Sequence, residues 1–376
     1  MKHHDVIVVG GGPAGIAASK VLSTAGLDVM LLDNASFHKD KCYGSILSPR
    51  SIKIFNKLFP DFYYPKKKVN IFELGQIQSR SYKTFFRIKI KNYIHSVNRV
   101  NFDMLLLKEA EKYGVKYSTD YIKSITVENN LFIVEGNDKY SAEYLIVASG
   151  VFGPKLLKIP DIEFEVPRFS TIYHTAKTTE DNLIKIGFFS EGYFWNLPQI
   201  QEFSAGVRFF ENKKVNNLHK AEEILGNPDE GIKETQVPLF EADKSFKNNN
   251  SFDGCLFVGN SAGFVDNWTG EGISFALKSG MEAASAIIKH YTRPARVNDQ
   301  YLYNIRKMAK HLILAESFRK TFYKNFPANL NLLSEKRLLK MIISYISSFS
   351  KSANHLFLKS LFVKTPELIS YVQDTE

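Results

Sequence analysis

The first residues of the chain alternate between short apolar runs and a segment with helical spacing. Residues 5–9 and 28–32 are mostly apolar runs of strand length, which favours buried strands. Between them, residues 13–25 carry several alanines, Ile16 and Leu22 at helical spacing. This order predicts a β-α-β unit whose two strands are parallel.

The next part of the chain changes from a helical to a strand-like pattern. Ser48 followed by Pro49 is typical of an N-cap with proline at the first helical position, so we expect a helix from there to about Leu58. Between residues 60 and 98, aromatic and Lys-rich pieces alternate, which predicts antiparallel strands. A helix is expected at about 102–113.

Later segments repeat this alternation between α/β and strand-rich regions. Residues 168–210 are mostly strand-like, and the polar residues 241–252 are expected to form a loop. From about residue 296 onward, three helices with aromatic faces are expected. The remaining expected elements are strands near 121–127, 131–135, 144–147 and 255–258 and a helix at 271–290.

Composition places the chain among ordinary globular proteins. Of its 376 residues, 44% are hydrophobic and 23% are charged, so a sizeable core is expected. Cys42 and Cys255 form no C-x-x-C pattern, and the histidines show no ligand pairing, so no disulfide framework or metal site is predicted. The N-terminal apolar run is too short for a signal peptide, and no stretch resembles a membrane-spanning helix, which indicates a cytoplasmic protein.

A glycine-rich turn joins the first predicted strand to the first predicted helix. The segment Gly10-Gly11-Gly12-Pro13-Ala14-Gly15 contains G-x-G-x-x-G: Gly10 permits the tight turn, Gly12 lets the backbone approach a pyrophosphate, and Gly15 allows close helix packing. Asp33 ends the second strand, where an acid accepts hydrogen bonds from a ribose hydroxyl. Strand, turn, helix and acid together predict a dinucleotide site.

A second glycine-rich segment late in the chain selects the dinucleotide. The run 256–263 follows a strand, and Gly270-Glu271-Gly272-Ile273 opens a helix. These residues resemble the second fingerprint of FAD-dependent hydroxylases and reductases, in which an acid binds the flavin ribitol. Asn260 stands at that position and accepts a hydroxyl hydrogen bond without a charge. Arg99 with Asp103, and Ser149 with Gly150, resemble further cofactor-side segments of the same family.

The substrate side carries a more specific pattern. The segment 192–198, Gly-Tyr-Phe-Trp-Asn-Leu-Pro, is followed after seven residues by 206–208, Gly-Val-Arg. This resembles a motif of the geranylgeranyl reductase family, Tyr-x-Trp-x-Phe-Pro and later Gly-x-Gly. Leu197 replaces the family's Phe, and Arg208 replaces its last Gly. Residues 41–50 also resemble the family's Cys-Gly-Gly-Gly-Leu-Ser-Pro-Arg segment.

The resemblance implies a fold like that of para-hydroxybenzoate hydroxylase and reduction of isoprenoid double bonds by FADH2. Tyr193 and Trp195 would share one face of a strand and wall an apolar pocket at the flavin. The alternative is that both are core aromatics of a sheet. The family places Cys42 near the flavin, where a thiol relays a proton or fills space.

The predicted site and function follow from these motifs. The catalytic candidates are Cys42, Tyr193 and Trp195, and the cofactor-binding candidates are Gly10, Gly12, Pro13, Ala14, Gly15, Asp33, Cys42, Arg99, Gly150, Asn260, Gly263, Gly270, Gly272 and Ile273. The predicted activity is FAD-dependent reduction of carbon–carbon double bonds in an isoprenoid or other long apolar substrate. Flavin-dependent monooxygenase or halogenase activity, and a non-enzymatic flavin-binding lipid carrier or sensor, stay open. No second dinucleotide fingerprint is visible, so the reductant would be transient NADPH or a reduced carrier protein.

The net charge of +10 is concentrated near the C-terminus, and the sequence leaves open which partner this basic segment binds. Between Lys289 and Lys364 there are 15 Lys and Arg residues against three acidic residues. This segment would meet anionic lipid on the inner face of the membrane, dock ferredoxin or flavodoxin, or form a solvated helical surface. The apolar residues expected to enter a lipid interface are Phe318, Phe322, Phe326, Leu338 and Ile342. No motif indicates nucleic-acid binding.

The fold class predicted from these patterns is α/β, with a Rossmann-type FAD domain, an interleaved antiparallel β-sheet substrate domain and a C-terminal helical segment. The predicted FAD-binding domain is discontinuous and comprises residues 1–60, 95–160 and 251–292. The predicted substrate domain comprises residues 61–94 and 161–250, and the helical segment comprises residues 293–376.

Overall fold

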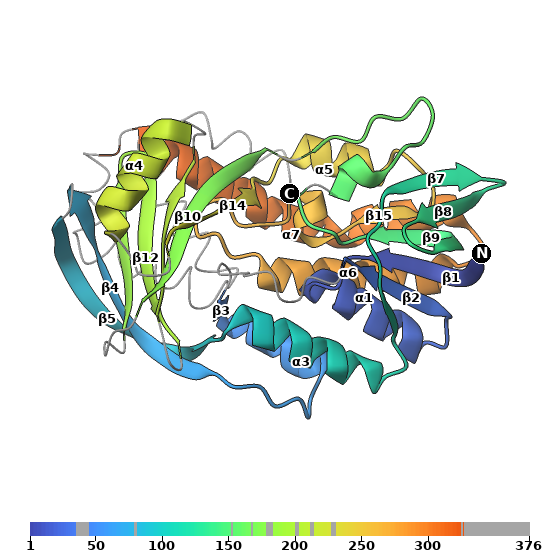
Figure 1. Ribbon diagram of the computed structural model, residues 1–376, viewed down its shortest axis with the longest axis horizontal. Coiled ribbons are helices and arrows are strands. Elements are labelled where there is room, and N and C mark those ends of the chain that lie inside the picture. Colours follow the sequence, from blue (N-terminus) through green and yellow to red (C-terminus); the bar gives the residue numbers. More distant parts are fainter. Residues whose placement is uncertain are drawn as a thin grey trace.

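Two β-sheets organise the chain and lie at opposite ends of the molecule in Figure 1. This computed structural model describes residues 1–34, 45–78, 81–151, 153–166, 168–177, 183–199, 203–210, 214–226, 231–324 and 326. The first sheet contains the N-terminal β-α-β unit, and the second contains the strand-rich regions. The predicted α/β fold class is confirmed.

The first sheet has the strand order β6-β2-β1-β9-β8-β7, and β15 pairs with the second half of β9. Its strands are β1 (Lys2–Val9), β2 (Val29–Asp33), β6 (Lys116–Thr119), β7 (Ser124–Glu128), β8 (Leu131–Glu135), β9 (Lys139–Val147) and β15 (Cys255–Phe257). β6, β2, β1, β9 and β15 are parallel. The apolar runs of β2 and β15 and of the second halves of β1 and β9 fit strands that are covered on both faces. Their carboxyl ends meet at one edge, where α/β folds bind ligands.

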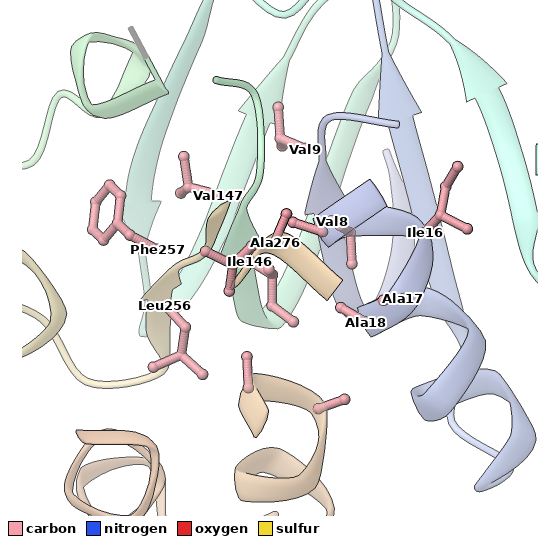
Figure 2. Close-up of a cluster of buried hydrophobic side chains, with 14 of the residues drawn as sticks. Val8, Val9, Ile16, Ala17, Ala18, Ile146, Val147, Leu256, Phe257 and Ala276 are labelled. Carbon is pink, nitrogen blue, oxygen red and sulfur yellow. The ribbon is translucent and has the colours of Figure 1, made fainter. Parts of the chain in front are cut away.

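Helices α1 (Pro13–Thr24) and α6 (Ile273–His290) pack tightly beside this sheet. At their contact, a side chain on Gly280 would collide with the backbone carbonyl of Ala14, so glycine is required for this approach. Figure 2 shows part of the resulting core, with labelled side chains from β1 (Val8, Val9), α1 (Ile16, Ala17, Ala18), β9 (Ile146, Val147), β15 (Leu256, Phe257) and α6 (Ala276). Segments more than 200 residues apart in sequence therefore share one core.

The two helices that follow α1 in the sequence, α2 and α3, each begin after a residue whose side chain caps the helix. Helix α2 (Pro49–Leu58) starts as predicted, because the Ser48 hydroxyl accepts a hydrogen bond from the N–H of Ser51 at 3.2 Å. Helix α3 (Arg99–Glu111) begins earlier than the predicted residue 102, because the Asn98 side chain caps it by accepting the N–H of Asn101 at 3.1 Å.

The second sheet has the order β14-β10-β13-β12-β11-β4-β5-β3 and is antiparallel except between β4 and β11. Its strands are β3 (Ile46–Leu47), β4 (Lys67–Gln78), β5 (Ser81–Ser96), β10 (Phe169–Lys177), β11 (Ile184–Phe189), β12 (Gly192–Pro198), β13 (Phe203–Phe209) and β14 (Lys233–Pro238). Helix α4 (Lys214–Leu225) covers one face by packing Ala221 and Leu225 against Val207 and Phe209. Because successive side chains of a strand point to opposite faces, the other face of the sheet carries a different set, which includes Tyr193, Trp195 and Leu197.

Helix α7 (Pro294–Lys324) connects the two cores and runs from one sheet region toward the other in Figure 1. Its first half packs on the first core, and its second half contributes Phe318 and Phe322 to the second core, around Trp268. Phe326 is buried there too. The predicted insertion of Phe318, Phe322 and Phe326 into a lipid interface is therefore wrong, because protein already covers them. No described helix is long and apolar enough to cross a membrane.

One expectation for the second half of the chain is tested only in part. Three helices were expected from about residue 296 onward; the long helix α7 forms the described part of this segment, and the rest, with Leu338 and Ile342, lies outside the described residues. A second expectation differs from the structure. Residues 241–252, expected to be a loop, contain helix α5 (Ala242–Asn249). The polarity of this segment misleads, because the buried Asn248 and Asn249 amides bond to backbone groups of Glu165, Ser245 and Phe257.

Candidate functional site

A pocket of about 520 Å³ opens at the carboxyl edge of the first sheet, where β1 and β2 end. This volume is within the usual range for cofactor sites, about 300–1,000 Å³. The sequence-predicted residues in its lining are Gly10, Gly12, Pro13, Ala14, Asp33, Arg99, Gly150, Asn260, Gly270, Gly272 and Ile273. Residues from five separate segments of the chain therefore meet around one space. Gly15 and Gly263 are not in the lining.

The glycine-rich turn has the geometry that the predicted cofactor requires. Gly10 has φ +115°, which favours glycine, and a side chain there would collide with the backbone of Ala148. A side chain on Gly12 would meet nothing within 4 Å and would project into open space. Gly15 packs against the carbonyl of Gly10, as its predicted helix-packing role requires. The first turn of α1 leaves backbone N–H groups without helical acceptors, which is the ordinary arrangement for binding phosphate.

Asp33 is held at the rim of this pocket by backbone amides. Its carboxylate accepts hydrogen bonds from the N–H of Gly11 and the N–H of Asn34, each at 2.6 Å. Such charge-assisted bonds fix the orientation of the carboxylate and tie the end of β2 to the glycine-rich turn. A carboxylate oxygen has further lone pairs, so the group can still accept a hydroxyl hydrogen bond.

Arg99 and Asp103 form a buried ion pair at the start of α3. The guanidinium donates through Nε at 3.2 Å and through one terminal nitrogen at 2.9 Å, and the two side chains are 8% and 1% exposed. Because this fork is two-pronged, it sets the direction of the Arg99 side chain at the pocket wall. The sequence motif therefore marks a positioned group and not a surface pair.

The second glycine-rich segment forms the other wall of the pocket. It contains the short helix η2 (Gly259–Ala262), a loop and the start of α6. Gly263 ends η2 with φ +72°, so its role is in the turn. Asp266 holds the loop by accepting the N–H groups of Trp268 and Thr269 at 2.9 and 2.8 Å. Gly272 and Ile273 then place the N-terminus of α6 in the pocket lining.

These residues fit FAD. The pocket combines a phosphate-binding helix N-terminus, a fixed carboxylate near the turn, and a second helix N-terminus at its other wall. Gly12 and Gly150 each leave open the space that a side chain would occupy, since no atom lies within 4 Å of the position that a Cβ would take. The residues that would hold the cofactor are therefore the sequence-predicted lining residues, with Gly15 and Gly263 shaping the turns around it.

An apolar cavity of about 180 Å³ adjoins the cofactor pocket. The two spaces share Val237, Gly270, Gly272 and Ile273 in their linings. Its apolar wall consists of Ile46, Phe72, Leu74, Ile94, Ile172, Ile186, Phe188, Tyr193, Trp195, Leu197, Val237 and Trp268. Most of these side chains come from one face of the second sheet, so the sheet itself builds the cavity.

Tyr193 and Trp195 both line this cavity, as the pocket hypothesis expected. Their ring centroids are 5.9 Å apart, and the two side chains are about nine-tenths buried. The Tyr193 hydroxyl donates to the backbone carbonyl of Thr269 at 3.0 Å, in the loop that also borders the cofactor pocket. Gly206 lies beneath the Trp195 ring, and a side chain there would collide with it. The first glycine of the motif thus makes room for its tryptophan.

Two polar groups at this boundary were not singled out as site residues from the sequence. Glu271 lines the cavity and accepts hydrogen bonds from the N–H and the hydroxyl of Ser274 at 2.8 and 2.6 Å. Burial raises the pKa of its carboxyl group, against the opposing effect of these bonds. Arg208 is fully buried, and it lies opposite Tyr193 on the same face of the second sheet. The sequence contained a signal for each of these two residues. Glu271 lies within the segment Gly270-Glu271-Gly272, and Arg208 stands where the geranylgeranyl reductase motif has its last glycine.

Cys42, predicted both as a catalytic and as a cofactor-side residue, lies outside the described residues. Cys255 is fully buried in β15, and burial raises the pKa of its thiol, so it is a core residue.

Comparisons with known proteins agree with this geometry. The profile of a family described as pyridine nucleotide-disulphide oxidoreductase matches residues 4–186. An uncharacterized protein of Methanosarcina barkeri is 28% identical over 96% of both chains. The digeranylgeranylglycerophospholipid reductase of Methanococcus vannielii is 26% identical over 82% of this chain and 83% of its own. The tryptophan 2-halogenase of Chondromyces crocatus is 25% identical over 75% of this chain and 60% of its own.

Among solved structures, a geranylgeranyl bacteriochlorophyll reductase-like protein from Thermoplasma acidophilum superposes with a TM-score of 0.77. It is 18% identical, and the match covers 100% of this chain and 99% of that chain. The fold, the pocket and the family profile over residues 4–186 point to one class of protein: the chain is similar to FAD-dependent oxidoreductases. Within that class, the predicted resemblance to the geranylgeranyl reductase family is confirmed as a likeness of fold and of distant sequence.

Proposed function

We propose that the protein is an FAD-dependent reductase that adds hydride from FADH2 to a carbon–carbon double bond of an isoprenoid or other long apolar substrate. The observation that carries the proposal is the shared wall of the two spaces. Gly270, Gly272 and Ile273 border both the cofactor pocket and the apolar cavity. A double bond in the cavity would therefore lie beside the cofactor, which is the arrangement that hydride transfer requires.

The residues of the cavity bind and orient the substrate in this proposal. The walls are aliphatic and aromatic, so they exclude water and favour an apolar chain or ring. Tyr193 and Trp195 restrict where the double bond lies, since both rings are held by buried neighbours. When bound and reduced, FAD supplies the hydride.

The proton that completes the reduction would come from Glu271. It is the carboxyl group among the cavity-lining residues that the structure describes, and burial raises the pKa of that group toward the range useful for proton donation. Its hydrogen bonds to Ser274 hold the carboxyl group at the N-terminus of α6. Cys42 stays a second candidate for this role from the family resemblance.

The size of the cavity sets how a long substrate would bind. A cavity of about 150 Å³ holds benzene, so the observed 180 Å³ accepts one ring or a short branched piece of chain. A long isoprenoid would therefore place only its reacting unit here. The rest of the chain would extend beyond the cavity.

The electron donor and the location of the protein follow as parts of the proposal. A transient NADPH or a reduced carrier protein such as ferredoxin or flavodoxin would recharge the flavin. The basic C-terminal segment would dock an acidic carrier or anionic lipid at the inner face of the membrane. Salt-sensitive sedimentation with anionic liposomes, compared with neutral ones, separates the lipid partner from the carrier.

A halogenase or monooxygenase is the second candidate, favoured by the similarity to tryptophan 2-halogenase. A halogenase needs a lysine at its substrate site, and the cavity lining described by the structure contains none. This favours reduction. A non-enzymatic flavin-binding lipid carrier would use the same two spaces without turnover.

Mass spectrometry of lipids and quinones from cells with and without the protein distinguishes these activities. Reduction adds two hydrogens for each double bond, oxygenation adds one oxygen, and halogenation adds a halogen with its isotope pattern. We expect hydrogen-rich lipids only in cells that contain the protein. Oxygenated or halogenated products would overturn the proposal, and an unchanged lipid and quinone profile would favour the carrier.

A further inference from the structure

A second concentration of positive charge, apart from the C-terminal segment, lies around strands β4 and β5. Between residues 53 and 93 there are ten Lys and Arg residues against two acidic residues, Asp61 and Glu73. In Figure 1, β4 and β5 lie at the outer side of the second sheet. Clustered charge of one sign produces a strong surface potential, so this region should select a partner of opposite charge.

Lys66 and Lys68 lie together at the start of β4. Lys68 is directly opposite His95 on β5, so the two side chains point to the same face of the sheet. The Tyr64 hydroxyl and the Nδ1 of His95 are hydrogen-bonded at 2.7 Å, and the Lys66 ammonium lies 4.4 Å from the centroid of the Tyr64 ring. The neighbour of His95 in the chain, Ile94, lines the apolar cavity, so this group points away from the cavity.

The same outward face continues along the two strands. Lys89 lies opposite Ile71, and Arg87 lies opposite Glu73. Because Phe72 lies between Ile71 and Glu73 and lines the cavity, these pairs point to the other side of the sheet. Lys89 and Arg87 are both exposed, and Arg87 is paired with Glu73 at 2.8 Å, so the net charge of this face comes from its lysines.

Two exposed tyrosines accompany the lysines. The Tyr63 side chain is 78% exposed and Tyr93 on β5 is 50% exposed. The Lys66 ammonium also lies 5.5 Å from the centroid of the Tyr63 ring. Tyrosine rings favour the headgroup level of a bilayer, and lysines there are attracted to lipid phosphates. The residues Tyr63, Lys66, Lys68, Lys89 and Tyr93 are called the basic face below.

We propose that the basic face docks on the surface of an anionic lipid bilayer, with its lysines at the lipid phosphates and its two tyrosine rings among the headgroups. An acidic protein would satisfy the lysines alone, whereas a bilayer also accepts the exposed rings. The opposite side of β4 and β5 walls the apolar cavity through Phe72, Leu74 and Ile94. Docking through this face would therefore bring the cavity wall close to the phase in which long apolar molecules dissolve.

The test is co-sedimentation of the full chain, loaded with FAD, with two kinds of vesicle. One kind contains phosphatidylglycerol mixed with phosphatidylcholine, and the other contains phosphatidylcholine alone. We expect binding to the anionic vesicles only, and this binding should weaken as salt is added. Changing Lys66, Lys68 and Lys89 together to Gln should lower the affinity by about a hundredfold, because each base near an anionic surface contributes separately. Tyr63→Ser combined with Tyr93→Ser should lower it by about fivefold.

The matched control changes Lys108, Lys123 and Lys158 together to Gln. These lysines are exposed and lie in the part of the chain that contains the first sheet, so the variant loses the same charge from another surface. It should bind anionic vesicles like the wild type. All variants should keep the flavin absorption spectrum of the wild type, because the changed side chains are on the surface.

Three results would overturn the inference. Equal losses in the two lysine variants would show an effect of net charge alone. Loss of binding only when Lys336, Arg337 and Lys340 are changed would assign docking to the C-terminal segment. A wild type that binds no vesicles, or that uses these lysines to bind an acidic protein or RNA, would exclude a bilayer as the partner of this face. None of these measurements needs turnover, so their outcome and that of the reductase proposal are independent.

Discussion

The cofactor pocket and the apolar cavity share a wall but are built in different ways. The cofactor pocket is formed largely by turns and helix N-termini, and its critical residues are glycines that leave space. The apolar cavity is formed by side chains from strands that pair across the second sheet. A site made of backbone depends on local spacing in the sequence, and a site made of side chains depends on register between distant strands. The two should therefore respond differently to substitution.

The largest expected effect is on the cofactor pocket, from Gly12→Val. A side chain on Gly12 meets no protein atom within 4 Å, so folding should be unaffected, but it fills the space that a pyrophosphate needs. We expect FAD affinity to fall by about a hundredfold or more, measured by flavin fluorescence titration. Far-UV circular dichroism and Tm should stay close to those of the wild type without FAD.

The exposed Gly26→Asn is the matched control, since Gly26 has φ +88° with no neighbour within 4 Å and asparagine tolerates that conformation. It should bind FAD normally. If Gly12→Val still binds FAD with wild-type affinity, the assignment of this pocket to the cofactor is wrong.

The next largest effect concerns the cavity, from Trp195→Ala. This change enlarges the cavity, so the substrate should lose its orientation, and turnover of flavin-loaded protein should fall by about tenfold or more. Loss of a buried tryptophan also costs about 3–5 kcal/mol of the free energy of unfolding, so soluble, FAD-loaded protein must be compared at equal flavin content. The assay is consumption of substrate per bound flavin.

The control is Phe194→Ala on the same strand. Its side chain points to the opposite face, toward α4, so it should reduce stability without changing turnover per flavin. A Trp195→Ala protein that keeps full turnover, or one that loses FAD, would return Trp195 to the role of a core aromatic.

The same contrast explains which parts of the molecule could be predicted from the sequence. The turn at Gly10–Gly15, Asp33 and the start of α6 were predicted because each depends on residues close in sequence. Arg208 and Glu271 were not assigned a role from the sequence. Strand pairing places Arg208 beside Ile172 and Tyr193, and packing of the loop before α6 against the second sheet places Glu271 in the cavity lining, so neither position can be read from local spacing. Aromatic residues of α7 were expected at a lipid interface, but Phe318 and Phe322 pack on Trp268, a contact that local patterns do not reveal.

A smaller effect tests Glu271 at the boundary between the two spaces. Burial raises the pKa of its carboxyl group, so the group stays protonated to higher pH than a free glutamate. If it donates the proton, turnover in wild type should fall as pH rises through this raised pKa, and Glu271→Gln should be slow with that limb absent. The measurement is kcat against pH under anaerobic conditions. A Glu271→Gln profile identical to the wild type would show that the proton comes from elsewhere.

The raised pKa also predicts the direction in which the stability of Glu271→Gln, relative to the wild type, changes with pH. A carboxyl whose pKa is raised in the folded state binds more protons there than in the unfolded chain, so its contribution to stability is lost as pH rises above its unfolded pKa. Glu271→Gln should therefore gain stability relative to the wild type as pH rises, because glutamine has no charge to bury. Tm measured across that pH range should show the difference growing, and a difference that shrinks would contradict the raised pKa.

The smallest expected effect comes from Asn260→Asp in the cofactor pocket. Asn260 lines the pocket from η2, at the position where the family fingerprint has an acid. An aspartate would accept a flavin hydroxyl through a charge-assisted bond, which is about twice as strong as a neutral one, so FAD affinity should rise by about three- to tenfold. Because the effect depends on one side chain meeting one hydroxyl, it tests side-chain placement in a site otherwise built of backbone. Fluorescence titration at two salt concentrations measures it, with Asn34→Asp at the rim as the matched control for added charge. Equal gains from both variants would indicate a general electrostatic effect, and unchanged or weaker binding by Asn260→Asp would show that this side chain does not face the flavin.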